Sequence, residues 1–262
     1  MTIWQAIVLG LVQGIGEFIP ISSSGHLVVM QQVFGINDPG MTFDIIVHLG
    51  TLCAVFAVFW KDILSLIKNP FQKMTAMLIV GTIPAVVLGY IIRGHMHVFS
   101  QAFLLASAFT FTGILLLIAD NIKHTNKTVR EMTLLDAIVV GCMQAAALPP
   151  GISRSGATIT GGLVSGLTRE TAARYSFLLS IIAIVGAGTL EVWDIIQSGE
   201  GVYRGDIPAF MVGFVVAAVS GYFSIRLLLA LIKKASLRYF AYYVFILAAL
   251  ILVDRFVFNL FF

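Results

Sequence analysis

Long apolar runs constrain the fold of this chain more than any other feature of its sequence. Several runs of about 18 to 22 residues carry almost no charge, and a helix of that length crosses a hydrocarbon core about 30 Å thick. Of the 262 residues, 59% are hydrophobic and 11% are charged. The surface of a water-soluble domain would not tolerate this composition. We therefore expect an all-α polytopic membrane protein.

Other features argue against further classes of protein. No basic residue precedes the apolar stretch 2–12, so we expect it to belong to the fold rather than to a removable signal peptide. Cys53 and Cys142 have no neighbouring metal ligands, and we interpret them as core residues. The net charge of +3 fits the basic excess that orients membrane proteins. No basic face with base-reading groups is present, so we expect no nucleic-acid partner.

The two halves of the chain match each other at a fixed spacing, which indicates a tandem duplication. The spacing is 131 residues early in each half and 132 residues later. We expect two repeats, 1–122 and 133–262, joined by a cytoplasmic linker at 123–132, within one membrane domain. The matched pairs are Gly10 and Gly141, Gln13 and Gln144, Ser24 and Ser155, Gly25 and Gly156, Gly81 and Gly213, and Gly89 and Gly221.

Each half is expected to contain five helical segments, ten in all. The first two in each half are short and flank a polar loop, so we predict re-entrant hairpins at about 3–36 and about 133–168. Three crossings follow each hairpin, and because three is odd the second repeat is expected to be inverted relative to the first. The predicted segments are 3–20, 27–34, 43–59, 74–92, 101–119, 134–148, 157–167, 175–196, 208–231 and 239–261.

The basic residues provide a test of this topology, because cytoplasmic loops carry an excess of Lys and Arg. On the predicted topology the side that holds the N-terminus receives only Arg93, Arg204 and Arg255. The opposite side is therefore expected to be cytoplasmic, and both termini extracytoplasmic. It receives Lys61, Lys68, Lys73, Lys123, Lys127, Arg130, Arg169, Arg174, Arg226, Lys233, Lys234 and Arg238.

Two polar loops, 21–26 and 152–156, interrupt the apolar sequence, one in each hairpin. Since inverted hairpins enter from opposite faces, we expect the tips of the two loops to meet within the membrane and to hold a phosphate. An arginine at membrane depth needs an anionic partner, and the fork of Arg154 suits phosphate oxygens. A helix that begins at Gly156 would offer free N–H groups to the same anion.

The loops also contain residues suited to phosphoryl transfer. We interpret Ser23 as the nucleophile and His26 as its base or as the acid for the leaving group. Water or His26 as the nucleophile stays open. Glu17 holds either a metal ion or His26 in this interpretation.

Structural explanations stay open beside the catalytic one. Small residues such as serine and glycine also let membrane helices approach closely. Glu17 and Arg154 could form a purely structural ion pair. His48 follows Asp44 by four residues, and we favour a structural hydrogen bond over catalysis for that pair.

The segments QGIGEFIPISSSGH and PGISRSGATITGGL resemble the two signature motifs of the bacterial undecaprenyl-diphosphate phosphatase family linked to bacitracin resistance. The resemblance covers the whole chain. It implies hydrolysis of undecaprenyl diphosphate to undecaprenyl phosphate and inorganic phosphate, which recycles the lipid carrier of cell-wall synthesis. It also implies a ten-helix inverted-repeat fold in the bacterial cytoplasmic (inner) membrane and dependence on a divalent cation, Mg²⁺ or Ca²⁺.

Carried over by position, the family's acidic motif falls on Gln13 and Glu17, its histidine on His26, and its PGxSRSG segment on 150–156 with Arg154 as the key cation. Gln at the first acidic position leaves Glu17 as the one charged candidate for a metal ligand. The expected catalytic residues are Glu17, Ser23, His26 and Arg154. The residues expected to bind substrate phosphate are Gln13, Ser22, Ser24, Gly25, Gln144, Ser153, Ser155 and Gly156.

The leading hypothesis is thus a membrane phosphatase whose pocket opens to the extracytoplasmic face. The alternative is a transporter or flippase for a polyprenyl phosphate lipid, because inverted repeats with broken helices are typical of transporters. The expected partners are a polyprenyl diphosphate and membrane lipids. A homodimer stays open.

Overall fold

The computed structural model describes residues 1–36, 40–122, 126–198, 207–232 and 236–262. Within these ranges the regular structure is helical, apart from one isolated bridge between Lys127 and Leu167. The helices are α1 (Ile3–Gly16), α2 (Ser23–Val33), α3 (Gly40–Val58), α4 (Trp60–Lys68), α5 (Lys73–Ile92), η1 (Arg93–Ser100), α6 (Ala102–Asn121), α7 (Leu134–Ala146), α8 (Arg154–Val164), α9 (Arg169–Ser198), α10 (Ile207–Leu231), α11 (Arg238–Val253) and η3 (Asp254–Phe258).

Helices long and apolar enough to cross a membrane confirm the expected all-α polytopic class. In the described part of the chain these are α5, α6, α9, α10 and the continuous stretch Arg238–Phe258. A sixth span forms if α3 and α4 count as one bent element.

The short helix α4 was not predicted as a separate element. The chain bends by 81° between α3 and α4, where the sequence suggested only an end at Phe59. α4 has charged residues, among them Lys61, Asp62 and Lys68, and none of its residues is buried. An amphipathic helix of this kind is more stable along an interface than across a hydrocarbon core.

The interpretation of the two cysteines as core residues is wrong, because Cys53 and Cys142 are both exposed on the outer surface of the bundle. An apolar segment does not tell which of its faces is buried when lipid is as apolar as the protein core.

Two short helices open each half of the chain, and they begin in the same way. Thr2 caps α1 and Thr133 caps α7, and in both cases the residue three positions later, Gln5 or Asp136, completes a capping box. The second helices match as well: the Ser22 hydroxyl accepts the N–H of Gly25, and the Ser153 hydroxyl accepts the N–H of Gly156. These caps stand at repeat-equivalent positions, 131 residues apart.

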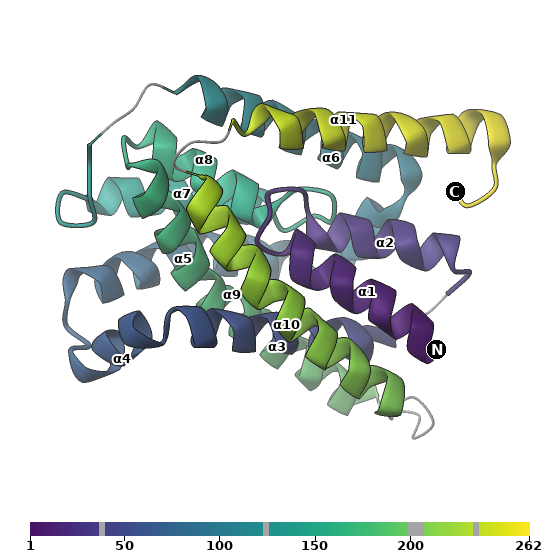
Figure 1. Cartoon of the computed structure of the whole chain (residues 1–262), viewed down its shortest axis with the longest axis horizontal. Helices are drawn as coiled ribbons and strands as arrows, with labels where there is room; N and C mark the ends of the chain where they lie inside the picture. Colours follow the sequence, from purple (N-terminus) through teal and green to yellow (C-terminus); the bar gives the residue numbers. More distant parts are fainter. Residues whose placement is uncertain (37–39, 123–125, 199–206, 233–235) are drawn as a thin grey trace.

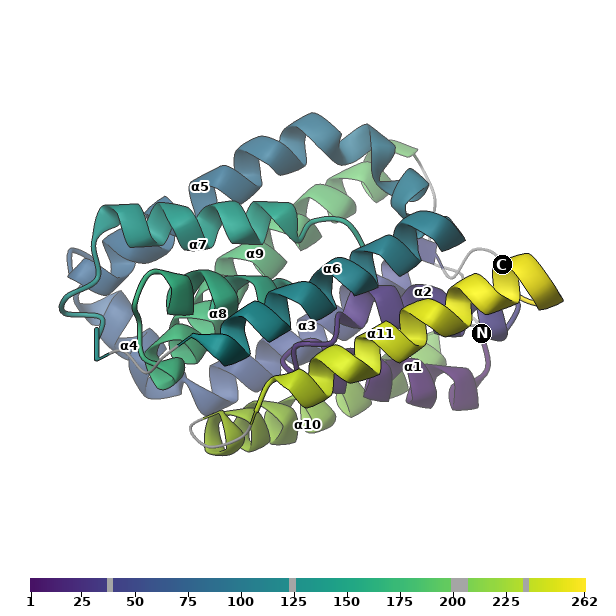
Figure 2. The same cartoon turned by 90° about the horizontal axis from the view of Figure 1, so that it is seen from above.

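The paired short helices enter the bundle from opposite ends. α1 runs inward from the end where both termini lie, and α2 returns to that end (Figures 1 and 2). α7 and α8 do the same from the other end. With 14 and 13 residues, α1 and α7 are each about 20 Å long and too short to cross. The loops that follow them meet in the middle of the bundle.

Contacts at glycine are reciprocal between the two halves. A Cβ on Gly10 of α1 would lie 2.7 Å from the carbonyl oxygen of Gly213 in α10, and one on Gly141 of α7 would lie 2.5 Å from the carbonyl oxygen of Gly81 in α5. Gly10 corresponds to Gly141, and Gly81 to Gly213. α1 therefore packs, backbone against backbone, on α10, and α7 packs in the same way on α5, which is the counterpart of α10 in the first half.

The loop tips repeat this pattern. A Cβ on Gly25 would lie 2.7 Å from the Cα of Gly151, and one on Gly156 would lie 3.4 Å from the Cβ of Pro20. Residues 20 and 151 are again 131 apart.

The end of the bundle opposite the termini holds α4, the start of α5, and the turn between α8 and α9 (Figure 1). Most of the basic residues counted above belong to these segments and to the neighbouring ends of α6, α10 and α11. Asp120 at the end of α6 fastens this region, since its carboxylate accepts the backbone N–H of Leu237 at 2.8 Å and the Nε–H of Arg238 at 2.9 Å. Lys123, Arg204, Lys233 and Lys234 lie outside the described residues.

Candidate functional site

The carboxylate of Glu17 is the centre of the polar network between the two loops. Glu17 directly follows α1, and its side chain is 8% exposed. One oxygen, Oε1, accepts a hydrogen bond from Nη2 of Arg154 in an ion pair. The other, Oε2, accepts the hydroxyl of Ser23 at 2.6 Å and the amide Nε2 of Gln13 at 3.1 Å. Both hairpins thus contribute to one buried charge pair.

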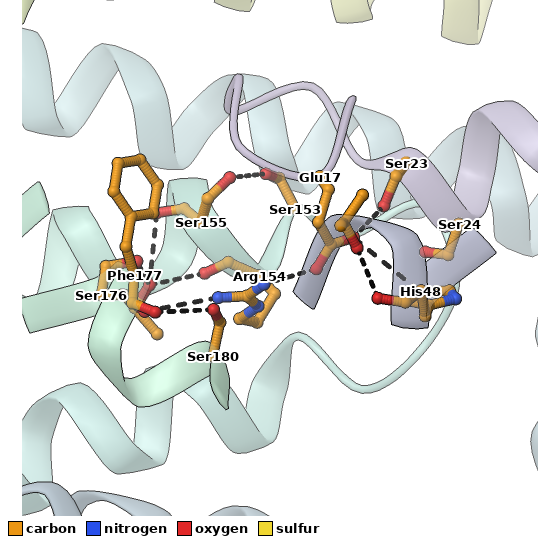
Figure 3. A network of polar contacts seen from close by, with 12 residues as sticks. Glu17, Ser23, Ser24, His48, Ser153, Arg154, Ser155, Ser176, Phe177 and Ser180 are labelled. Atoms are coloured by element: carbon orange, nitrogen blue, oxygen red, sulfur yellow. Dashed lines mark hydrogen bonds and ion pairs between the residues drawn. The ribbon is translucent and has the colours of Figure 1, made fainter. Parts of the chain in front are cut away.

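Arg154 is the first residue of α8 and approaches Glu17 from the side opposite Ser23 (Figure 3). Its Nη1 donates to the carbonyl oxygen of Ser176 on α9 at 3.4 Å. The Arg154 side chain is 16% exposed, so its charge is largely removed from solvent. Separating a buried ion pair leaves an uncompensated charge in the interior, which costs more free energy than forming the pair. The pairing with Glu17 therefore holds the guanidinium in place between the loops.

The two loops are held by backbone geometry as well as by caps. Ser22 has φ of 72°, a value that non-glycine residues rarely adopt, and such strain is frequent at functional sites. Gly151 has φ of 93°, and its carbonyl accepts the hydroxyl of Thr112, which in turn accepts the N–H of Ser153. Thr112, on α6, was not singled out from sequence, and nothing in its sequence context distinguishes it.

Hydroxyl groups cluster at the start of both helices. Ser22 and Ser24 have their Oγ atoms 3.4 Å apart, and Ser153 and Ser155 have theirs 3.2 Å apart. The first turns of α2 and α8 therefore gather hydroxyls around the N–H groups of Gly25 and Gly156, which the Ser22 and Ser153 hydroxyls cap. Helix N-termini of this kind favour anions.

The imidazole of His26 makes its hydrogen bonds away from Ser23. Nδ1 lies 2.7 Å from the carbonyl oxygen of Ser22, and Nε2 lies 2.8 Å from the hydroxyl of Tyr243 on α11. The ring stacks on Tyr243 and meets Phe109 edge-on. The hydroxyl of Ser23 donates to Glu17 instead.

His48 on α3 faces the site, although its sequence context favoured a structural role. Its Nδ1 bonds to the backbone carbonyl of Asp44, at 2.7 Å, and its Nε2 lies 3.8 Å from Oε2 of Glu17. Figure 3 shows His48 and Ser23 on the same side of that carboxylate. The signal that could have identified it is an ionisable side chain inside an apolar span.

Gln13 and Gln144, which correspond in the repeat, are both buried. Within the described residues, Oε1 of Gln13 and both amide atoms of Gln144 have no hydrogen-bond partner. Buried polar atoms normally have one, so both side chains have unused capacity for water or a ligand.

The residues around Glu17 do not fit a preformed metal site. No group of three or more His, Cys, Asp or Glu side chains suited to a metal occurs in the described part of the chain. Both carboxylate oxygens of Glu17 already accept hydrogen bonds from Arg154, Ser23 and Gln13. Glu17 is therefore occupied by donors of the protein itself.

Comparison with known families shows which family has this sequence pattern. A family model described as bacitracin resistance protein BacA matches residues 6–250. The chain belongs to the BacA family. The match includes both polar loops and all the helices that carry the residues of the site.

Curated relatives in this family share about two fifths of their residues with the chain. The undecaprenyl-diphosphatase of Carboxydothermus hydrogenoformans is 43% identical over 257 residues, which cover 97% of each protein. That of Halothermothrix orenii is 39% identical over 256 residues, 97% of this chain and 98% of the relative. Undecaprenyl-diphosphatase 4 of Bacillus thuringiensis subsp. konkukian is 42% identical over 254 residues, 96% of this chain and 97% of the relative.

Proposed function

We propose that this member of the BacA family hydrolyses undecaprenyl diphosphate to undecaprenyl phosphate and inorganic phosphate. The relatives that match nearly the whole chain are named undecaprenyl-diphosphatase. The observation that carries the proposal in this chain is the buried cluster of Glu17, Ser23 and Arg154, which combines a cation for phosphate with a hydroxyl already bonded to a carboxylate. The transport alternative is not favoured by the relatives.

Ser23 is the nucleophile in this proposal, and Glu17 is the base that receives its proton, because the 2.6 Å hydrogen bond already points that proton at Oε2. Arg154 binds the terminal phosphate and balances its charge. Nε2 of His26 becomes free to contact the leaving phosphate once its ring exchanges Tyr243 for substrate. Ser22, Ser24, Ser153 and Ser155 bind the remaining oxygens, and the N–H groups of Gly25 and Gly156 join them when the phosphate displaces the capping hydroxyls of Ser22 and Ser153.

We propose that the activity depends on Mg²⁺ or Ca²⁺ because the diphosphate of the substrate, rather than a side chain of the protein, binds the cation. Diphosphate oxygens are good ligands for both ions, and Mg²⁺ in particular is commonly bound through substrate phosphates. The donors around Glu17 leave the carboxylate no free oxygen. No step of the chemistry above therefore depends on a protein-bound metal.

The inverted repeat is likewise a proposal, with residues 1–122 and 133–262 as its halves and the linker 123–132 on the cytoplasmic side. The reciprocal glycine contacts support it. A two-fold relation between the halves exchanges equivalent residues, so the contact of Gly10 with Gly213 implies a contact of Gly141 with Gly81, and both are present. The opposed entry of the two hairpins supports it as well. The chain would lie in the bacterial inner membrane with both termini and the pocket facing outward.

Cysteine labelling in intact cells tests this orientation. In a background where Cys53 and Cys142 are alanine, we expect an impermeant thiol reagent to modify Gln32→Cys, at the end of α2, and not Asn69→Cys, after α4. Both positions are exposed. The reverse pattern would place the termini inside, and modification of both would show that the cells leak.

The function itself is tested with purified protein and undecaprenyl diphosphate. We expect release of inorganic phosphate with Mg²⁺ or Ca²⁺ present, and loss of that release when a chelator removes the cation. Movement of a polyprenyl phosphate across liposomes without any phosphate release would instead support the transporter.

A further inference from the structure

His48 has one ring nitrogen committed to the backbone and the other directed at the site. Nδ1 lies 2.7 Å from the carbonyl oxygen of Asp44. A carbonyl oxygen only accepts, so the proton of a neutral imidazole resides on Nδ1. Nε2 then carries the lone pair, and it faces Oε2 of Glu17 at 3.8 Å. This is beyond hydrogen-bond length, but such contacts often tighten when substrate binds.

The same oxygen, Oε2, is the acceptor for the Ser23 hydroxyl. Its other neighbours are the amide of Gln13 and the imidazole of His48. An amide takes up no proton near neutral pH, whereas an imidazole does. Among these described contacts of Oε2, His48 is therefore the group that can relieve Glu17 of a proton.

The other histidine of the site is placed differently. Nδ1 of His26 is committed to the carbonyl of Ser22, and its Nε2 is paired with the hydroxyl of Tyr243. In this arrangement the lone pair of His26 is engaged by a neighbour on α11, and that of His48 faces the Ser23–Glu17 pair.

We infer that His48 is a positioning residue that acts through Glu17 by receiving the proton of Ser23. The inference rests on the proposed phosphatase function. As Oγ of Ser23 bonds to the terminal phosphorus, the bond from that phosphorus to the bridging oxygen breaks, and undecaprenyl phosphate leaves with the electron pair. The Ser23 proton passes to Oε2 of Glu17 and then to Nε2 of His48.

Water completes the cycle. Its oxygen bonds to the phosphorus of the phosphoserine, the bond to Oγ breaks, Oγ takes one proton of the water, and inorganic phosphate leaves with the other. The proton on His48 is released to solvent. The exposure of the two side chains fits this direction, since His48 is 31% exposed and Glu17 is 8% exposed.

Acidic groups surround His48 on several elements. Glu17 faces it from the end of α1, Asp44 from its own helix, and Glu191 from α9. Asp44 is held by the amide of Gln31 at 3.2 Å, and Arg154 stands on the far side of Glu17.

The test compares wild-type protein with His48→Gln on undecaprenyl diphosphate across pH. Glutamine keeps a polar side chain but takes up no proton. We expect kcat to fall by about 10²-fold or more, with KM and the thermal midpoint nearly unchanged. In the wild type, kcat should decline toward acid pH, and this acid limb should be absent from His48→Gln.

Wild-type kcat or an unchanged acid limb in His48→Gln would overturn the inference. If that variant fails to fold, His48→Ala with imidazole in the buffer decides instead: restored phosphate release supports the relay, and no restoration overturns it. Cys53→Ala, an exposed position on the same helix, is the matched control and should keep full activity. Failure of the proposed function would look different, because the wild type itself would then release no phosphate.

Discussion

Arg154→Ala is expected to lower kcat/KM for phosphate release by about 10³-fold or more, the size of effect that an arginine has on phosphoryl transfer. Arg154 supplies the charge that faces the phosphate, and in the described site it is the cation paired with Glu17. Arg154→Lys restores the charge without the two-point fork, so we expect activity between that of Arg154→Ala and the wild type. Phosphate release from undecaprenyl diphosphate measures both.

Arg154→Ala should also weaken the fold, because it leaves the Glu17 carboxylate buried without its partner. Breaking a buried ion pair in this way costs about 3 kcal/mol, which lowers the thermal midpoint in detergent. Arg174→Ala is the matched control: it removes an ion pair at the far end of the bundle, in which Nη2 donates to both carboxylate oxygens of Asp62, and it should leave kcat unchanged. Full activity in Arg154→Ala would remove the phosphate clamp from the proposed site.

Ser23→Ala is expected to reduce kcat by about 10³-fold or more while KM changes little, because the variant keeps the phosphate-binding groups and loses the nucleophile. Stability should fall by about 2 kcal/mol, the contribution of a hydrogen bond to a charged group, and Oε2 of Glu17 retains the amide of Gln13. Acid quenching of the wild-type reaction, followed by mass spectrometry, should detect phosphate on Ser23.

Ser107→Ala serves as the control for Ser23→Ala. Ser107 is an exposed serine whose hydroxyl donates to the carbonyl of Phe103 on its own helix, so its loss should leave kcat unaltered. If Ser23→Ala loses less than tenfold and no phosphoserine is trapped, water attacks the phosphorus directly and the role of Ser23 is limited to binding.

Part of the site could be foreseen because a carboxylate and a guanidinium are too costly to bury apart. Glu17 follows the first helix of one hairpin and Arg154 begins the second helix of the other, and the structure brings them into contact. The hydrogen bond from Ser23 to Glu17 was harder to predict from the sequence, since a hydroxyl can turn toward several acceptors. His26 was expected beside Ser23 because it follows three residues later, yet its ring turns to Tyr243, a residue 217 positions away in the chain.

His48 shows that separation along the sequence does not predict which residues a side chain contacts in the fold. The expected hydrogen bond between His48 and Asp44 forms, at the backbone carbonyl. It leaves Nε2 of His48 to face Glu17, 31 positions away. Helical spacing limits which neighbours a side chain can reach along its own helix. It says nothing about which other helix packs against that face.

The sequence by itself determined the membrane class, the approximate spans, the internal match between the halves and the two polar loops, because these depend on apolar length and local residue chemistry. The tertiary structure decided the bend into α4, the outward faces of Cys53 and Cys142, and which histidine faces Glu17. Those features depend on how helices rotate and pack against one another. In a chain that is apolar on nearly every face, hydrophobicity does not distinguish a lipid-facing side from a buried one.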